Sequence, residues 1–165
     1  MRIVAALSAS LMLAACSHIP LVSRQPVAGT VVGVVEFDTG LTKFSTVTGT
    51  YHQDMCSKAN GDVAVHLSDR EMKAILAKAD KGAFYKVSGD LTTNWPDPPG
   101  KPPHCAAFRL RIESGANHNE VSWDCGADGS NTPPPQVAPL VELVQKTLRS
   151  RGEVQALQWS SCPVR

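Results

Sequence analysis

The feature of the sequence that most constrains the fold is a stretch of regular alternation at residues 105–125, which reads CAAFRLRIESGANHNEVSWDC. Apolar side chains occupy alternate positions in both halves of the stretch: Phe108, Leu110, Ile112, Val121 and Trp123. Charged or polar residues stand between them, and SGAN separates the halves. Because successive side chains of a strand point to opposite faces, the pattern predicts a β-hairpin with one buried and one solvated face.

A helix is predicted to follow Ser68. Ser68 and Glu71 have the spacing of a capping box, in which the serine hydroxyl accepts from the backbone N–H of Glu71 and the glutamate reaches back. Apolar residues then recur on one helical face at Met72, Ile75, Leu76 and Ala79. Gly82 stands where a C-terminal cap is expected.

A second amphipathic helix is predicted after the polar segment GADGSNTPPP. Its apolar stripe consists of Val137, Leu140, Val141, Val144 and Leu148. The prolines at 133–135 and 139 fit only its approach and its first turn. Arg149 and Arg151 complement the negative end of the helix dipole, and Gly152 is the expected cap.

Strands are predicted in the remaining β-branched and apolar runs, at residues 27–38, 42–51, 63–67, 83–91 and 154–159. Asp-Thr-Gly turns the chain after the first run, and Asn60-Gly61 is a strong signal for a tight turn. The order of the elements predicts an α+β fold. We expect an antiparallel sheet of about six to seven strands with two helices packed on one face.

Residues 1–15 have the layout of a secretory signal peptide, which is removed from the mature protein. Arg2 is their only charge, an apolar run extends from Ile3 to Leu13, and two alanines follow. A positive start, a short apolar centre and small residues before the cleavage site are typical of such a signal. The run is far shorter than the roughly 20 residues that a membrane-spanning helix needs.

The end of this segment, Leu13-Ala14-Ala15-Cys16, resembles the bacterial lipobox. In lipoproteins the cysteine is lipidated on its thiol, the signal is cut before it, and the new amine is acylated. The resemblance implies that Cys16 anchors the mature chain in a membrane, because several acyl chains hold a protein that one chain would bind only marginally. Ser17 stands where an aspartate would retain a lipoprotein at the inner membrane. The resemblance therefore implies an outer-membrane protein that faces the periplasm.

The mature chain is predicted to have a tether and one domain. Residues 16–26, CSHIPLVSRQP, are mixed in character and contain two prolines, which favours a tether. Residues 27–165 are then a single α+β domain, since about 150 mature residues is the usual size of one domain. Without residues 1–15 the chain has 15 basic and 15 acidic residues. This balance argues against nucleic-acid binding and against electrostatic adhesion to a membrane.

The cysteines support an exported, disulfide-bonded domain. Of the five cysteines, Cys16 is assigned to lipid and four remain, an even number in a compartment that permits disulfides. Four cysteines allow three connectivities. Because one cysteine stands near each open end of the predicted hairpin, the simplest pairing is Cys105–Cys125, which leaves Cys56–Cys162. A zinc site is disfavoured because no C-x-x-C and no close Cys/His set is present.

No motif predicts catalysis, a metal or a cofactor. Asp38-Thr39-Gly40 superficially resembles the aspartic-peptidase motif, but Leu41 follows it and only one copy is present, so a hairpin turn is the better interpretation. Residues 124–131, DCGADGSN, fail two ligand positions of a calcium loop. A nucleophile elbow, a dinucleotide-binding motif and a P-loop are all missing from the sequence. We therefore predict a protein that is not an enzyme.

Residues 92–104, TTNWPDPPGKPPH, are predicted to form a stiff exposed loop, because five prolines in eight positions remove hydrogen-bond donors and fix φ. Trp95, Asp97 and Lys101 make this loop a candidate contact for a partner, since a stiff loop that presents an aromatic side chain loses little entropy on binding. The alternative is that Trp95 folds back over the core as a lid.

The order of elements over residues 30–150 loosely resembles emfourin-type inhibitors of metallopeptidases. This resemblance concerns the fold and has no diagnostic motif, so it implies no inhibitory residues. Taken together, the sequence predicts a small lipid-anchored envelope protein that binds a partner. A peptidase inhibitor is the alternative function, and an envelope hydrolase is the minor one.

Overall fold

The computed structural model of the protein describes residues 31–55, 61–92, 107–124 and 132–157. Its strands are β1 (Val34–Asp38), β2 (Thr42–Ser45), β3 (Thr50–Gln53), β4 (Asp62–Ala64), β5 (Phe108–Ser114) and β6 (Asn117–Trp123). Its helices are α1 (Asp69–Lys81), the 3₁₀ turn η1 (Phe84–Lys86), α2 (Ala138–Arg149) and the short α3 (Gly152–Gln155).

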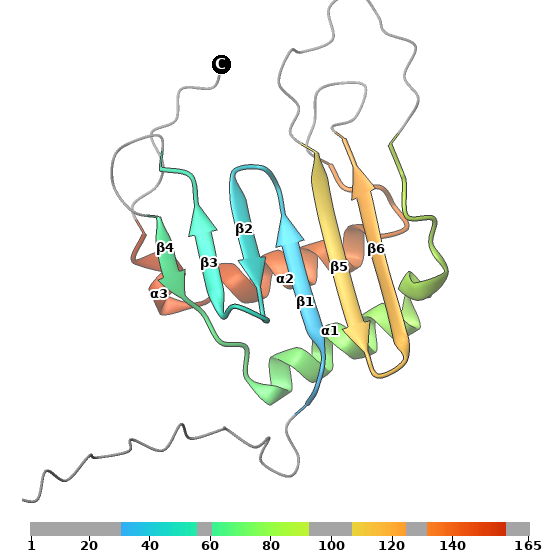
Figure 1. Ribbon diagram of the computed structural model, residues 1–165, viewed down its shortest axis with the longest axis horizontal. Helices are drawn as coiled ribbons and strands as arrows, with labels where there is room; N and C mark the ends of the chain where they lie inside the picture. The colour runs from blue at the N-terminus through green and yellow to red at the C-terminus, as the bar shows by residue number, and fades with distance from the viewer. Residues whose placement is uncertain (1–30, 56–60, 93–106, 125–131, 158–165) are drawn as a thin grey trace, which may run out of the picture.

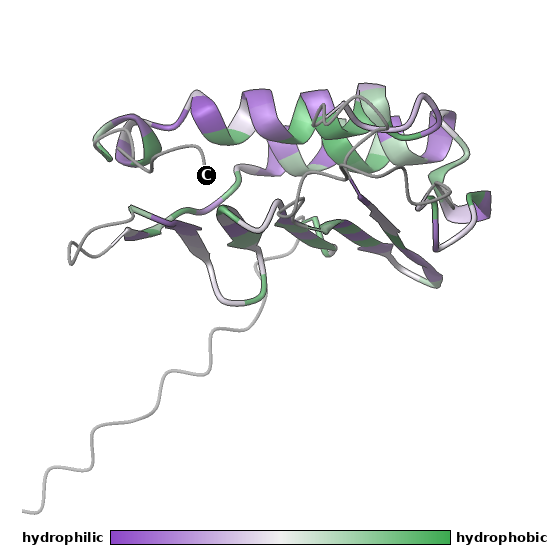
Figure 2. Cartoon of the chain, turned by 90° about the horizontal axis from the view of Figure 1, so that it is seen from above, coloured by the Kyte–Doolittle hydropathy of each residue, from purple (hydrophilic) through white to green (hydrophobic). Residues whose placement is uncertain are grey.

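The six strands form one antiparallel sheet in the order β4-β3-β2-β1-β5-β6 (Figure 1). The chain therefore runs as a meander through four strands, crosses back through α1, and adds the β5–β6 hairpin beside β1. Helices α1 and α2 lie together in a second layer on one face of the sheet (Figure 2). The predicted α+β fold, with two helices on one face of an antiparallel sheet, is confirmed.

The core lies between these two layers. The sheet contributes the apolar residues that alternate along its strands, Val35, Phe37, Phe44, Tyr51, Phe108, Leu110, Ile112, Val121 and Trp123. The helices contribute the two predicted stripes, from Met72 to Ala79 and from Val137 to Leu148. Within the described ranges no polar or charged residue is fully buried. Burial of apolar area is therefore the main force that holds the layers together.

The predicted features of the β5–β6 hairpin and of α1 are confirmed. Gly115 has a φ of 59° in the two-residue turn of the hairpin, a conformation that glycine adopts without strain. At the start of α1, the backbone N–H of Ser68 donates to Glu71 Oε2 at 2.7 Å, and Ser68 Oγ accepts from the backbone N–H of Glu71. Burial acts to raise the pKa of Glu71, but these hydrogen bonds and the charge of Arg151 outweigh it and lower the pKa. Gly82 is the C-cap, as predicted.

The single strand predicted at residues 42–51 is wrong, because the structure has two strands, β2 and β3, joined by a turn. Phe44 and Tyr51 are both buried, and they are an odd number of residues apart. One continuous strand would place them on opposite faces of the sheet, whereas the hairpin places both in the core. Gly49, with a φ of 65°, makes the reversal possible.

The strand predicted at residues 83–91 is also wrong. The segment forms the 3₁₀ turn η1, and only Asp90 makes an isolated bridge, to Ser122. The side chain of Asn119 donates to the carbonyl oxygens of Phe84 at 2.7 Å and Val87 at 3.1 Å. These carbonyls are therefore satisfied by a side chain instead of by a neighbouring strand, which leaves Phe84 free to enter the core.

Four further boundaries differ from the prediction, and the first is that of β4, which ends at Ala64 and not at residue 67. The first strand begins at Val34, and the described residues before it, 31–33, are not in the sheet. The final strand predicted at residues 154–159 is instead the short helix α3 as far as the description extends, because Gln155 and Ala156 donate to the carbonyls four residues earlier. Gly152 is the first residue of α3, and Ser150 caps α2 in its place.

Candidate functional site

The face of the sheet opposite the helices, which we call the open face, is polar along all six strands. Its residues are Glu36, Asp38, Lys43, Ser45, Thr50, His52, Asp62, Arg109, Arg111, Glu113, His118, Glu120 and Ser122. They alternate with the core residues of the same strands, and within the described part of the chain no helix covers them (Figure 2). The open face is therefore a solvated surface, and the helix layer packs against the opposite face of the sheet.

The register of the sheet arranges these side chains in rows across the strands. One row runs through all six strands in the order Asp62, His52, Lys43, Asp38, Arg109 and Ser122. Acidic side chains contact a neighbour on the next strand at two points along it. Asp62 Oδ1 lies 2.5 Å from His52 Nδ1, and Asp38 Oδ2 lies 3.5 Å from Lys43 Nζ. Directly opposed charges of unlike sign stabilise neighbouring strands by a few tenths of a kcal/mol, up to about 1 kcal/mol.

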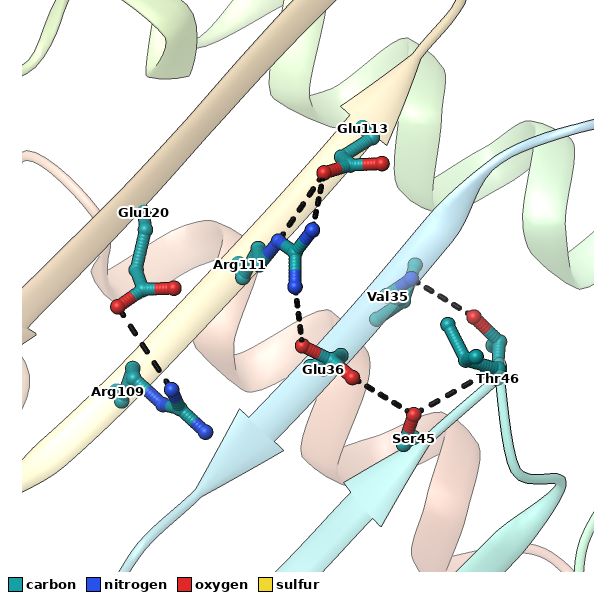
Figure 3. Close-up of polar contacts among 9 residues, drawn as sticks. Val35, Glu36, Ser45, Thr46, Arg109, Arg111, Glu113 and Glu120 are labelled. Carbon is teal, nitrogen blue, oxygen red and sulfur yellow. Dashed lines mark hydrogen bonds and ion pairs between the residues drawn. The ribbon is translucent and has the colours of Figure 1, made fainter.

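The second row passes through Ser45, Glu36 and Arg111, and the guanidinium of Arg111 lies between Glu36 of β1 and Glu113 of its own strand, β5 (Figure 3). Its Nη1 is 3.0 Å from Glu36 Oε2, and its Nε donates to Glu113 Oε1 at 3.1 Å. The hydroxyl of Ser45 donates to the other oxygen of Glu36 at 2.8 Å. The hydrogen bonds and charge of Glu113, followed by those of Glu36, raise the pKa of Arg111. The network therefore fixes a charged centre that joins β2, β1 and β5.

A shallow hollow of about 280 Å³ opens on this face over the first three strands and β5. Its polar lining consists of Glu36, Asp38, Lys43, Ser45, Thr48, Thr50, His52 and Arg109. The floor is formed where Phe37 and Phe44 pass beneath the polar side chains. A small polar side chain or loop of another molecule could enter this hollow and meet both positive and negative groups.

The side chains of the open face can be compared with the arrangements that catalysis and metal binding use. The closest resemblance to catalytic machinery is the pair His52–Asp62, but no described hydroxyl donates to His52 as a serine or threonine nucleophile would. Among residues of the described ranges, no three His, Cys, Asp or Glu side chains gather as a metal site requires. The Asp-Thr-Gly segment forms the turn between β1 and β2, in which the Gly40 N–H donates to Asp38 Oδ1 at 2.7 Å.

The site residues predicted from the sequence lie outside the described ranges. They are the lipidated residue Cys16, the disulfide partners Cys56, Cys105, Cys125 and Cys162, and the loop residues Trp95, Asp97 and Lys101. Sequence analysis did identify the charged side of the β5–β6 hairpin. It missed the rows across the sheet, because they depend on which strands are neighbours. The signal available in the sequence was the unusual density of charge at the solvated positions of β1 and β5.

In the described part of the chain, no helix has the length and apolar character needed to cross a membrane. Comparison with known proteins gives no further assignment: no family model, no curated protein and no solved structure matches the chain.

Proposed function

We propose that the protein is a lipid-anchored, disulfide-bonded binding module of the cell envelope, which presents the open face of its sheet to a protein partner. The observation that carries the proposal is the pair of charged rows on this face. Several of their side chains are already held by ion pairs, between strands for Lys43–Asp38 and Arg111–Glu36, so less side-chain entropy is lost when a partner docks. The tether predicted at residues 16–26 would leave the domain free to orient this face.

The charges of the open face favour a protein partner over a nucleic acid. Its acidic residues are Glu36, Asp38, Asp62, Glu113 and Glu120, and its basic residues are Lys43, Arg109 and Arg111. A surface with an excess of acids repels phosphate, whereas alternating signs specify the position and orientation of a partner with the complementary pattern. In this proposal, the predicted loop at residues 92–104, with Trp95, Asp97 and Lys101, supplies a second, aromatic contact.

The anchor is tested by replacing Cys16 with serine. We expect the variant to lose membrane fractionation, either as an uncut precursor or as a soluble protein, because the thiol that accepts the lipid is gone. Intact-mass spectrometry of the native protein provides the independent check. A native protein that lacks acyl groups, or that retains residues 1–15, would contradict the anchor whatever the fractionation of the variant.

The binding face is tested by charge reversal at Arg109, which is about half exposed and lies between strands β1 and β6. Arg109→Glu would place a negative charge between Asp38 and Glu120. The protein is cross-linked to its partner in intact envelopes and then purified from membranes. We expect Arg109→Glu to reduce the amount of partner protein recovered about fivefold or more, since like charges across an interface cost several kcal/mol.

The matched control is Lys73→Glu, the same change of charge at an exposed position of α1, on the helix side. It should leave recovery of the partner unchanged. Equal recovery with wild-type protein, Arg109→Glu and Lys73→Glu would show that the open face is not the binding surface. A stability measurement on each variant separates loss of binding from loss of fold.

A further inference from the structure

On the helix side of the sheet, a groove of about 340 Å³ opens between the last turns of α2 and the end of the sheet near the β1–β2 turn. We call it the α2 groove. It lies across the sheet from the open face and shares no charged residue with it. Its volume is at the lower end of the roughly 300–1,000 Å³ typical of small-molecule sites.

The floor of the α2 groove is apolar and largely aromatic, whereas polar side chains line much of its walls. Phe37, Tyr51 and Phe108 come from three different strands, and Leu148 closes the groove from α2. All four are core residues that still expose 3–7% of their surface. At the rim, Leu41 is 54% exposed, one of the few large apolar side chains that the described structure leaves in solvent. The apolar surface that a ligand can contact therefore consists of the exposed edges of these floor residues and of Leu41 at the rim.

Polar groups that can hold a ligand stand on one side only. Arg149 and Gln145 project from α2, and neither side chain has an ion pair or side-chain hydrogen bond with another described residue. The guanidinium is not needed to satisfy the end of the helix, because the N–H groups of Ser150 and Arg151 already donate to the last carbonyls, those of Lys146 and Leu148. Arg149 therefore keeps its planar set of donors available.

The hydroxyl groups at the other side of the groove contact one another. Tyr51 hydrogen-bonds to Thr42, and the Thr42 hydroxyl lies 2.8 Å from that of Thr39. Burial raises the pKa of Tyr51, against the opposing effects of the Arg149 charge and the Thr42 hydrogen bond. The phenol is thus neutral, and Arg149 is the one charged residue among those that line the groove.

We infer that the α2 groove binds a small organic carboxylate with a flat apolar body, its carboxylate on Arg149 and Gln145 and its ring against Phe37, Tyr51 and Phe108. A carboxylate matches the bidentate geometry of a guanidinium, and the amide of Gln145 supplies a further donor. An aromatic ring gains both apolar burial and edge or face contacts with the three aromatic side chains. This site goes beyond the proposed partner surface, and either can fail without the other.

The test is a titration of the purified full chain with 2-naphthoate, followed by chemical-shift changes of the groove residues. We expect saturable shifts centred on Tyr51, Phe108 and Leu148. Arg149→Gln should weaken the binding about tenfold or more, because it removes a charged hydrogen bond to the carboxylate. Arg149→Lys should restore part of the affinity, since it restores the charge without the planar fork.

Two controls make the result specific. Arg109→Gln makes the same change on the open face and should alter the affinity less than twofold. The neutral analogue 2-naphthalenemethanol should bind about tenfold or more weakly than the carboxylate. Absence of saturable shifts in the groove at millimolar 2-naphthoate would overturn the inference. Equal affinity for the acid and the alcohol, or equal loss in the Arg149 and Arg109 variants, would overturn it as well.

Discussion

Replacing Trp123 with alanine is expected to lower the free energy of unfolding by about 3–5 kcal/mol, the cost of truncating a large buried aromatic residue. The side chain is 1% exposed at the end of β6. Its ring stacks on that of Phe108, with centroids 5.5 Å apart and planes inclined by 8°. The truncation would remove this contact and leave a cavity that the packed sheet and helices cannot readily close.

The conservative variant Trp123→Phe separates packing from hydrogen bonding. Within the described structure the indole N–H of Trp123 is buried without a hydrogen-bond partner, so its removal loses no bond there. We expect the phenylalanine variant to cost less than half as much as alanine, because the ring that faces Phe108 is kept. Denaturant unfolding measures the free energy of unfolding of both variants, provided that its dependence on denaturant concentration, the m-value, is the same as in the wild-type protein. A loss below about 1 kcal/mol for the alanine variant would contradict a core role for Trp123.

Local patterns in the sequence were sufficient where the chain's own neighbours determine its structure. The capping box at Ser68 involves residues three positions apart, and it forms as predicted. The β5–β6 hairpin likewise depends on alternation and on a two-residue turn at Gly115. In both cases the interacting groups are brought together by the local geometry of a helix or a hairpin.

The prediction failed where tertiary contacts override a local preference. Residues 42–51 are rich in threonine, and their composition predicts one strand. Because Phe44 and Tyr51 are both buried on the same face of the sheet, the chain has to reverse between them. Residues 83–91 also favour a strand by composition. There, the amide of Asn119, distant in the sequence, binds two carbonyls and stabilises a 3₁₀ turn. The role of Asn119 cannot be identified from residues 83–91 themselves, and the burial of Phe44 and Tyr51 on one face cannot be identified from the composition of residues 42–51.

The candidate sites depend still more on distant neighbours. The ion pair of Arg111 with Glu36 joins residues 75 positions apart, and it exists only because β5 returns to pair with β1. Alternation along β5 indicates that Arg111 is solvated but not which charge it meets. The same holds for Arg149: its position at the end of a helix suggests a role toward the helix dipole, and only the packing of α2 over Tyr51 and Phe108 places it beside a groove.

The two predicted disulfides should have the largest combined effect on stability. Cys105–Cys125 would close a loop of about 20 residues and contribute roughly 3 kcal/mol, and Cys56–Cys162 would close about 107 residues and contribute near 5 kcal/mol. All four cysteines lie outside the described residues, so both pairings stay predictions from the sequence.

The pairing Cys105–Cys125 is compatible with the β5–β6 hairpin only under a condition on the register of its strands. Phe108 pairs with Trp123 and every described pair of the hairpin keeps the same register, so its continuation would bring Cys105 opposite residue 126 and not opposite Cys125. Side chains one step out of register point to opposite faces. The bridge therefore requires that the register of the described hairpin does not continue as far as Cys105.

Non-reducing peptide mapping of the native protein tests both bridges together, and unfolding with and without reductant measures their contribution. We expect the two predicted linked peptides and a loss of several kcal/mol on reduction, the greater part of it absent from a Cys56→Ser, Cys162→Ser variant whose longer loop is already open. A link between Cys56 and Cys105 would refute this connectivity while preserving an oxidised domain. Four free thiols would refute the disulfides altogether, and with them one of the two arguments that the domain functions in an oxidising compartment.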